Sequence, residues 1–395
     1  MVKAGIDALF KDEKLLKRLE SRKIGLVINV SSVNSALERT LDVFLEWGKA
    51  RVEAIFALEH GINGVVPYME EIKDETDPKT GIPVKSLYGR DLKSLRPGED
   101  ALSGLDAVIF DVQDAGSRYY TFVNSFTFMF EPCRKNNVEI FVLDRPNPAG
   151  CLKIEGNLVR EGFTSFVGQY PLPNRHSLTA GELLNFIARK FFKDIEVVVV
   201  GCEGYERGLS FEDTGLNWVA PSPNMPSPET AVLYTGMCLL EGTNLSEGRG
   251  TARPFKVFGA SYIKDPFALA DRLNGEGIQG AGFLPMFFYP SCDKHAGELC
   301  GGVEIFITDR ERFNSLLAGI AVLKNTLAMH RDHFRWRTEP YEFVNDRLAI
   351  DLLLGDDNIR YAIEAGASLT DIEGYFYAKA QAEFREEIRD FLIYD

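Results

Sequence analysis

Polar side chains able to act on a substrate follow three predicted strands in the first half of the chain, at the points where those strands end. One strand runs into Glu59, His60 and Gly61, and the next two run into the segments 111–120 and 144–148. Ligands of open parallel sheets bind beyond the carboxyl ends of the strands, so we expect these strand exits to converge on one site. A single Asp at such a place is usually a helix cap or a turn former, but three polar exits together favour a site. The residues that we expect there are Glu59, His60, Asp111, Gln113, Asp114, Arg118, Tyr120, Asp144, Arg145 and Asn147.

Glu59 is the strongest catalytic candidate among these residues. Glu is a poor turn former, and the neighbouring Gly61 would allow the backbone to approach a ligand closely. His60 suggests a metal ligand, but the chain has only 5 histidines. Apart from His330 and His333, which fit a solvated helix face, none has the spacing of a metal site. We therefore expect no metal.

A second cluster of reactive side chains lies in the glycine-rich segment 221–254. It contains Glu241, Glu247 and Arg249 together with Asn224 and Asn244. Closely spaced glycines expose these polar groups on a tight backbone, which favours a wall of a binding site. The alternative is a structural network of Arg and Glu at a domain junction.

A third candidate is the pair Arg175 and His176, which precede a predicted helix. An arginine at a helix N-terminus can bind a substrate anion together with the free backbone amides. An Arg held by a local carboxylate for structural reasons is an equally good explanation.

Composition limits the possible functions. The chain has 395 residues, of which 45% are hydrophobic, and a net charge of −14. That length favours two domains, and the negative charge opposes binding to nucleic acid or anionic membranes. The 6 cysteines form no C-x-x-C pair, and no apolar run has the length of a membrane span. We expect a cytoplasmic protein that binds a small ligand; its oligomeric state is not predicted.

The first half of the chain has the pattern of an α/β fold with a doubly wound parallel sheet. Short apolar runs alternate with helical patterns, as in strands that are covered on both faces. No G-x-G-x-x-G follows the first strand, so a dinucleotide is not implied. The expected strands are 23–30, 52–58, 107–112, 138–144 and 196–201, and the expected helices are 35–48, 122–136 and 179–192, the last with a capping box from Thr179 to Glu182.

The pattern changes near residue 254, which indicates a second, smaller α+β domain. We expect helices at 266–274 and 309–330, strands at 283–289 and 302–308, and a helical tail at 368–392. The predicted domains are 1–253 and 254–395. The cleft between them is the expected location of the site.

Several segments resemble the bacterial exo-β-N-acetylmuramidases, which hydrolyse peptidoglycan fragments. The matching segments run collinearly over most of the chain. They are EHG at 59–61, TGIPVKSLYG at 80–89, FDVQDAGSRYYTF at 110–122, LDRPNPAG at 143–150, EGNLV at 155–159, PLPNRHSLTAGEL at 171–183 and PSPNMP through LLEGTNLSEGRGTARPF at 221–255.

This resemblance implies a Rossmann-like domain joined to a smaller α/β domain, with the site between them. It also implies removal of a terminal N-acetylmuramic acid from the non-reducing end of a saccharide, without a cofactor, and it makes Glu59 the candidate catalytic acid. Glycoside hydrolysis generally needs a second carboxyl group. Glu247, Asp144, Glu241, Asp111 and Asp114 are the candidates for it.

Muramic acid carries a lactyl carboxylate, which calls for an arginine in the site. Arg118, Arg175 and Arg249 are the candidates. Tyr119 and Tyr120 are expected to divide their roles, one stacking on a sugar and one pointing into the core. A non-catalytic saccharide or muropeptide binding protein is the alternative function, and a nucleotide-dependent sugar enzyme is disfavoured by the missing glycine motif.

Overall fold

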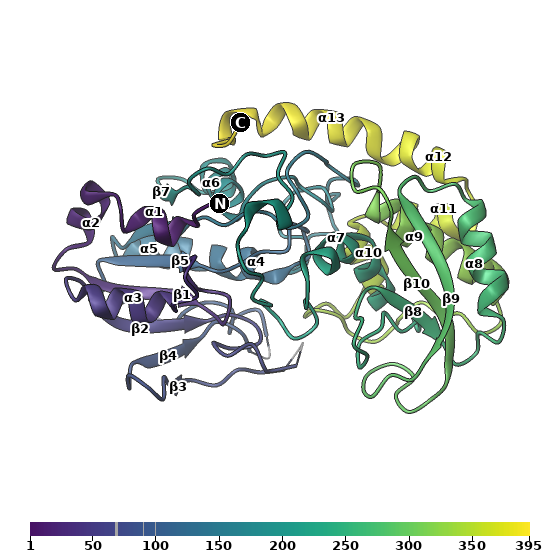
Figure 1. The fold of residues 1–395 in the computed structure, drawn as a ribbon, viewed down its shortest axis with the longest axis horizontal. Helices are drawn as coiled ribbons and strands as arrows, with labels where there is room; N and C mark the ends of the chain where they lie inside the picture. Colours follow the sequence, from purple (N-terminus) through teal and green to yellow (C-terminus); the bar gives the residue numbers. More distant parts are fainter. Residues whose placement is uncertain (68–69, 90, 99) are drawn as a thin grey trace.

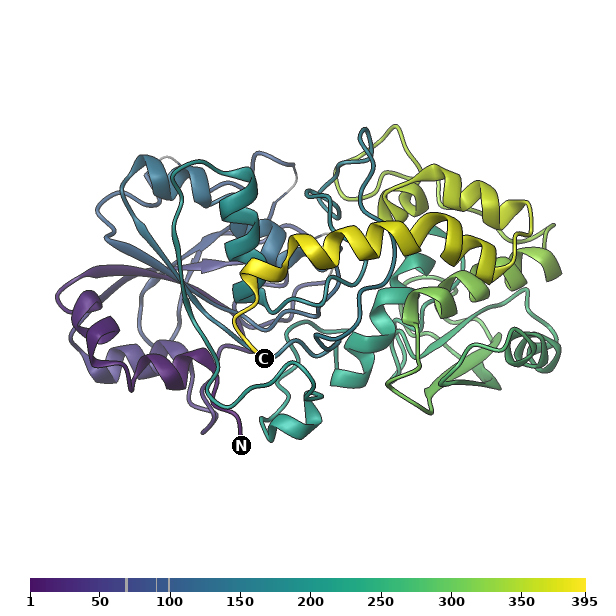
Figure 2. The same ribbon diagram turned by 90° about the horizontal axis from the view of Figure 1, so that it is seen from above.

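The chain folds into two parts, each with its own sheet (Figure 1). The structure is a computed structural model and describes residues 1–67, 70–89, 91–98 and 100–395. A large sheet is built from the first 200 residues, and a small sheet with most of the remaining helices lies beside it. Figure 2 shows the last helices running from the second part back to the first, where the chain ends.

The large sheet has seven strands in the order β3-β4-β2-β1-β5-β6-β7. All neighbouring strands are parallel except β3 and β4, which are antiparallel. This arrangement confirms the predicted doubly wound parallel sheet. The strands are β1 (Lys23–Ile28), β2 (Arg51–Ala57), β3 (Glu75–Thr76), β4 (Pro83–Ser86), β5 (Ala107–Asp111), β6 (Glu139–Leu143) and β7 (Val197–Val200). The short strands β3 and β4 were not predicted.

Helices cover both faces of this sheet, which explains why its strands are apolar along their length. In β5, Val108 and Phe110 belong to one apolar core, while Ala107 and Ile109 belong to another on the opposite face. The first core continues into the second part of the molecule. The helices around the sheet are α1 (Gly5–Leu9), α2 (Glu13–Leu19), α3 (Thr40–Trp47), α4 (Thr121–Thr127), α5 (Phe130–Lys135) and α6 (Ala180–Phe191).

Local sequence sets where several of these helices begin and end. The predicted capping box of α6 is present, because Thr179 and Glu182 each accept a hydrogen bond from the other's backbone amide. The single helix predicted at 122–136 is instead divided into α4 and α5. Pro132 explains the break, because in a continuous helix its ring would clash with the carbonyl group of Phe128.

The second part contains a three-stranded antiparallel sheet in the order β8-β10-β9. Two of its strands were predicted, and β8 was not. The long helix predicted from residue 309 starts later, at Ser315, because Asn314 caps it by accepting a hydrogen bond from the Leu317 amide. The strands are β8 (Val257–Ala260), β9 (Ala281–Phe288) and β10 (Cys300–Ile307), and the first helices are α7 (Pro228–Met237), α8 (Pro266–Gly275) and α9 (Ser315–Met329).

Helix α7 packs closely on α9 through glycines. A Cβ atom on Gly236 would lie 1.8 Å from the carbonyl oxygen of Ser315, and one on Gly319 would lie 2.3 Å from that of Gly236. Only glycine fits at these two positions. Residues before 253 therefore pack on residues after 254, and the predicted boundary between 253 and 254 stays a prediction.

The C-terminal helices tie the two parts together, as the predicted helical tail implies. The hydroxyl of Tyr394, one residue from the end, donates a 2.6 Å hydrogen bond to Asp144 after β6. No helix in the described part of the chain combines the length and apolarity that crossing a membrane requires. The remaining helices are α10 (Ala349–Leu354), α11 (Asp357–Glu364), α12 (Leu369–Ile372) and α13 (Ala378–Glu387), with short turns at η1 (Glu212–Thr214), η2 (Cys238–Gly242), η3 (Glu373–Tyr377) and η4 (Arg389–Phe391).

Candidate active site

A pocket between the two parts gathers three carboxyl groups and an arginine. Glu59 reaches it from the end of β2, Glu241 and Arg249 from the segment after α7, and Glu342 from the loop before α10. The pocket therefore lies at the carboxyl end of the large sheet, where ligands of such sheets bind. Its other lining residues are His60, Tyr119, Tyr120, Thr121, Phe122, Val167, Ser222, Asn224, Met225, Tyr234, Phe255 and Tyr341.

Glu59 is held at the rim of the sheet by a tight turn and by the next strand exit. The Gly61 amide donates to the Leu58 carbonyl group, and both His60 and Gly61 have positive φ angles, of 72° and 75°. Glycine suits this backbone conformation, which explains Gly61. The Thr121 hydroxyl group, at the start of α4, donates a 2.6 Å hydrogen bond to Glu59 Oε2. The Glu59 carboxyl group is thus directed toward the pocket while only 6% of the residue is exposed.

The orientation of His60 fixes the role of its second ring nitrogen. Its Nδ1 atom lies 2.7 Å from the carbonyl oxygen of Val66. A carbonyl oxygen only accepts hydrogen bonds, so Nδ1 carries the proton of the neutral ring and Nε2 is an acceptor. His60 can therefore accept a hydrogen bond from a hydroxyl or amide group of a ligand.

Glu241 and Arg249 form a neutralised unit on the opposite wall. The Arg249 guanidinium group donates to Glu241 Oε1 at 2.5 Å and to Glu247 Oε1 at 2.9 Å. The other Glu241 oxygen accepts a 2.7 Å hydrogen bond from the Tyr341 hydroxyl group. Glu247 also pairs with Lys294 at 2.9 Å. Glu241 and Glu247 thus belong to the Arg and Glu network that was the alternative interpretation of this segment, although Glu241 and Arg249 also line the pocket.

Glu342 differs from these two carboxylates. It is 6% exposed, and its Oε2 atom has no hydrogen-bond partner among the residues that the structure describes. Burial raises the pKa of Glu342 well above its usual range, and the charges of Glu59 and Glu241 raise it further. Its carboxyl group therefore keeps its proton more readily than an exposed one does.

The other predicted acids do not line the pocket. Asp144 is fully buried and accepts hydrogen bonds from the Thr179 and Tyr394 hydroxyl groups, both at 2.6 Å, and from the Gly181 amide. Burial raises its pKa to about 6, and these donors oppose the shift. Burial opposes the ionised form of Glu247, but Lys294 and Arg249 hold its pKa below the usual range. Asp111 accepts a 2.6 Å hydrogen bond from Arg145, and Asp114 accepts one from the Gly116 amide.

Most of the predicted cationic and amide residues also lie outside the pocket, within internal networks. Arg118 donates to the carbonyl groups of Asn157, Leu172 and Leu353, which connects the two parts of the molecule. Arg175 pairs with Glu155 at 2.5 Å, in agreement with the structural alternative. Burial, together with the charge of Arg175, lowers the pKa of His176 to about 3. Gln113, Arg145, Asn147 and Asn244 bind backbone carbonyl groups.

Six of the predicted site residues line the pocket: Glu59, His60, Tyr120, Asn224, Glu241 and Arg249. Tyr119 lines it too, and its hydroxyl group bonds inward to the carbonyl group of Thr235. Sequence analysis missed Tyr341 and Glu342. Their segment has no motif and lies far from the other site residues in the sequence, so no local signal pointed to them.

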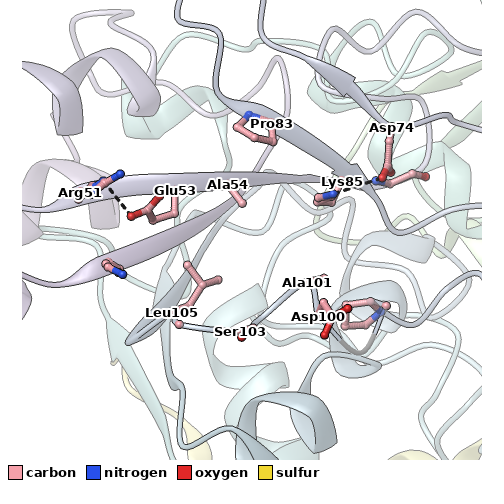
Figure 3. Close-up of a pocket in the computed structure, with 15 residues that line it drawn as sticks. Arg51, Glu53, Ala54, Asp74, Pro83, Lys85, Asp100, Ala101, Ser103 and Leu105 are labelled. Carbon is pink, nitrogen blue, oxygen red and sulfur yellow. Dashed lines mark hydrogen bonds and ion pairs between the residues drawn. The ribbon is translucent and has the colours of Figure 1, made fainter.

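A second hollow, of about 630 Å³, is lined by residues of β1, β2 and β4 and by the segment 100–105 (Figure 3). Arg51, the first residue of β2, pairs there with Glu53 at 2.8 Å, and Lys85 of β4 pairs with Asp74 at 3.6 Å. Its charges thus pair with each other, and Glu59 does not line it. In the described part of the chain, no three side chains of His, Cys, Asp or Glu come together in a way that would hold a metal ion.

Comparison with known families matches almost the whole chain to two adjacent family models. Residues 24–229 match the N-terminal domain, and residues 232–394 the C-terminal domain, of the exo-β-N-acetylmuramidase NamZ. The chain is also 37% identical, over 393 residues, to the peptidoglycan β-N-acetylmuramidase NamZ of Bacillus subtilis strain 168. That alignment covers 100% of this chain and 91% of the relative.

Two solved structures have the same fold. Both are DUF1343 family proteins from Bacteroides fragilis NCTC 9343. One has a TM-score of 0.87 at 31% identity, and the other a TM-score of 0.77 at 27% identity. In each case the alignment covers 100% of this chain and 99% of the other chain.

Proposed function

The chain belongs to the exo-β-N-acetylmuramidase NamZ family, and from this premise we propose that the pocket around Glu59 hydrolyses the bond to a terminal N-acetylmuramic acid. The protein is a glycoside hydrolase that acts on peptidoglycan fragments. The observation that carries the assignment of the site is that Glu59 is directed into a pocket whose opposite walls bear further carboxyl groups. A pair of carboxyl groups facing one bond is what most glycosidases use.

The pocket supplies the other groups that a muramyl sugar requires. His60 Nε2 is an acceptor for a sugar hydroxyl or an N-acetyl amide group. Tyr120 and Tyr234 line the pocket with aromatic rings, and Asn224 lines it with an amide group. A pocket, in contrast to an open groove, suits a sugar at the end of a chain. The reaction needs only acid and base groups, so we propose no cofactor.

Arg249 is the candidate for binding the lactyl carboxylate of muramic acid. Of the three arginines considered from the sequence, it lines the pocket, whereas Arg118 and Arg175 are held in internal networks. A planar guanidinium group can bind a carboxylate through two parallel hydrogen bonds. Its existing bonds to Glu241 and Glu247 fix its orientation before the substrate arrives.

The Glu59→Gln variant tests this function. The amide keeps the size of the side chain but neither donates a carboxyl proton nor takes up the proton of a water molecule. We expect release of N-acetylmuramic acid from a chromogenic muramide to fall by a factor on the order of 10² to 10⁴. Glu339→Gln, which changes an exposed carboxylate near the pocket loop, is the control and should keep full activity. Undiminished turnover by Glu59→Gln would remove Glu59 from the mechanism.

Membership of a hydrolase family argues against the alternative of a non-catalytic binding protein.

We place the enzyme in the cytoplasm, in the recycling of cell-wall fragments. All six cysteines are free and five of them are buried, which suits a reducing compartment. Detection of the native protein in the membrane or extracellular fraction of its own cells, with none in the cytoplasmic fraction, would contradict this placement.

A further inference from the structure

A strained two-residue turn carries Glu342 into the pocket. The backbone amides of Tyr341 and Val344 donate to each other's carbonyl groups at 3.0 and 2.9 Å. The two central residues, Glu342 and Phe343, have φ angles of 42° and 69°. Turns with positive φ at both central positions favour Asn and Gly, because other side chains are strained there. A Glu followed by a Phe therefore needs an explanation outside the turn itself.

Packing explains Phe343. Its ring lies 5.6 Å from that of Phe166 and 6.2 Å from that of Tyr88, centroid to centroid, so the loop before α10 is anchored on the first part of the molecule. On the other side, the Tyr341 hydroxyl group is fixed on Glu241. These two anchors hold the intervening Glu342 against the pocket.

Packing does not explain Glu342. A buried carboxyl group is normally compensated by hydrogen bonds or by a cation. Glu342 is buried with one oxygen unbonded, and no described Lys, Arg or His lies within ion-pair distance of it. The Tyr88 side chain forms a hydrogen bond with Glu342, which leaves the second carboxyl oxygen without a partner among the described residues. Backbone strain combined with a buried acid that has no ion-pair partner is typical of a functional group. The charged or titratable groups that act on it are Glu59, Glu241, Arg337, Arg249 and Tyr88.

We propose that Glu342 is the second catalytic carboxyl group, that it holds the proton given to the glycosidic oxygen, and that Glu59 is its ionised partner. This inference rests on the proposed function of the same pocket. It changes the roles expected from the sequence, in which Glu59 was the acid. The Thr121 hydroxyl group that donates to Glu59 favours a carboxylate at that position.

The other candidates for the second carboxyl group are already used. Glu241 and Glu247 are paired with Arg249, and Glu247 also with Lys294. Asp111, Asp114 and Asp144 do not line the pocket. Glu342 lines it with one carboxyl oxygen unbonded, and burial raises its pKa well above the usual range.

The proposed step is cleavage of the glycosidic bond by Glu342 as the acid and Glu59 as the carboxylate. The Glu342 proton moves to the glycosidic oxygen while the bond between that oxygen and C1 of muramic acid breaks, and the electron pair of the bond stays on the oxygen. The developing positive charge at C1 faces the Glu59 carboxylate. Water supplies the hydroxyl group at C1, and its remaining proton restores a single proton to the pair of carboxyl groups. The net reaction is hydrolysis.

Leaving groups of different acidity test these roles. A dinitrophenolate departs without being protonated, whereas the hydroxyl group of a second sugar needs the acid. With the full-length Glu342→Gln variant, we expect turnover of a muramyl disaccharide to fall at least a hundredfold, and turnover of the dinitrophenyl muramide to fall less than tenfold. The alkaline limb of its pH profile should disappear. Glu59→Gln should lose turnover of both substrates, and Glu339→Gln should turn over both at the wild-type rate.

Several results would overturn the assignment. One is wild-type turnover of the disaccharide by Glu342→Gln. A second is an equal loss of both substrates with an unchanged pH profile, in a variant whose circular dichroism is that of the wild type. A third is a loss of turnover in Glu59→Gln that affects the disaccharide alone, which would make Glu59 the acid and Glu342 the ionised partner. Failure of the proposed function would look different, because the wild type itself would then release no N-acetylmuramic acid.

Discussion

The ring of Phe343, in the loop before α10, lies 6.2 Å from the ring of Tyr88, which follows β4 of the large sheet. Phe343 thus brings a segment from the last quarter of the chain to the carboxyl end of the first sheet. The Tyr88 side chain in turn forms hydrogen bonds with two of the three carboxyl groups of the pocket, those of Glu59 and Glu342. Burial raises its pKa above the usual range, and Glu59 and Glu342 raise it further. The contact between the two rings therefore holds the segment that carries Glu342 against the first part of the molecule.

Removing this anchor should affect activity more than stability. We expect Phe343→Ala to lower the free energy of unfolding by about 2 kcal/mol, less than for a fully buried Phe because this ring is only partly buried. We also expect kcat to fall by a factor of about 10 to 100, because misplacement by about 1 Å is costly in a site that depends on positioning. Phe343→Leu, which keeps apolar bulk, should recover most of both. Chemical denaturation and steady-state kinetics measure the two effects. A loss of stability with unchanged kcat would contradict this role.

The buried acid Glu342 should make stability depend on pH. Burial, with Glu59 and Glu241 adding to it, raises its pKa in the folded state. The folded protein therefore keeps a proton that the unfolded chain releases near pH 4.3, the approximate pKa of a free Glu. The resulting stabilisation is fully present below that pH and is lost as the pH rises through the raised pKa.

Glu342→Gln removes this dependence, so the unfolding midpoint of the variant should exceed that of the wild type by an amount that grows with pH. Thermal unfolding of both proteins from about pH 5 to about pH 9 measures the difference. Asp114 and Asp144, whose pKa values burial raises to about 7 and about 6, are present in both proteins, so their contributions cancel. A difference that stays constant over this range would show that Glu342 does not hold a proton in the folded state.

The fold was largely predictable because its signals are local. A strand covered on both faces is apolar over most of its length, as in residues 107–110 of β5, and the capping box of Thr179 and Glu182 marks the start of α6. Pro132 marks the break between α4 and α5, which follows from the same kind of local chemistry. By contrast, β8 is four residues long and is stabilised by pairing with β10, a partner more than 40 residues away.

The site was predictable only in part, because sequence does not show the direction of a side chain at a strand exit. Glu59 follows β2 and Asp111 ends β5, and these two strands are parallel and flank β1 in the same sheet. Glu59 lines the pocket, while Asp111 turns inward to Arg145. Glu342 was not predictable at all. It reaches the pocket through a turn in which its residue type is unfavourable, and the contact that directs it there, between Phe343 and Tyr88, spans some 250 positions of the chain.

His60 should contribute to substrate binding through Nε2. His60→Asn is the suitable variant, because Asn tolerates the positive φ of 72° at this position. We expect KM for the muramide to rise about tenfold, the usual result of losing one hydrogen bond to a ligand. The unfolding midpoint should change little. Equal KM values at neutral pH would exclude the contact.

Arg118 and Arg249, two arginines that look alike in the sequence, should respond oppositely to replacement by Lys. Arg118 donates to three carbonyl groups, and a single ammonium group in its place would leave some of them unpaired, at a cost of about 2 to 4 kcal/mol in unfolding free energy. The KM of the Arg118→Lys protein that does fold should be unchanged.

Arg249→Lys should instead raise KM for the muramide at least tenfold, because a Lys loses the paired hydrogen bonds to the lactyl carboxylate. A substrate analogue without the lactyl group separates the two explanations, since Arg249→Lys should bind it as well as the wild type does. If Arg118→Lys raised KM for the muramide and Arg249→Lys did not, the lactyl group would have to be bound near Arg118, outside the pocket described above.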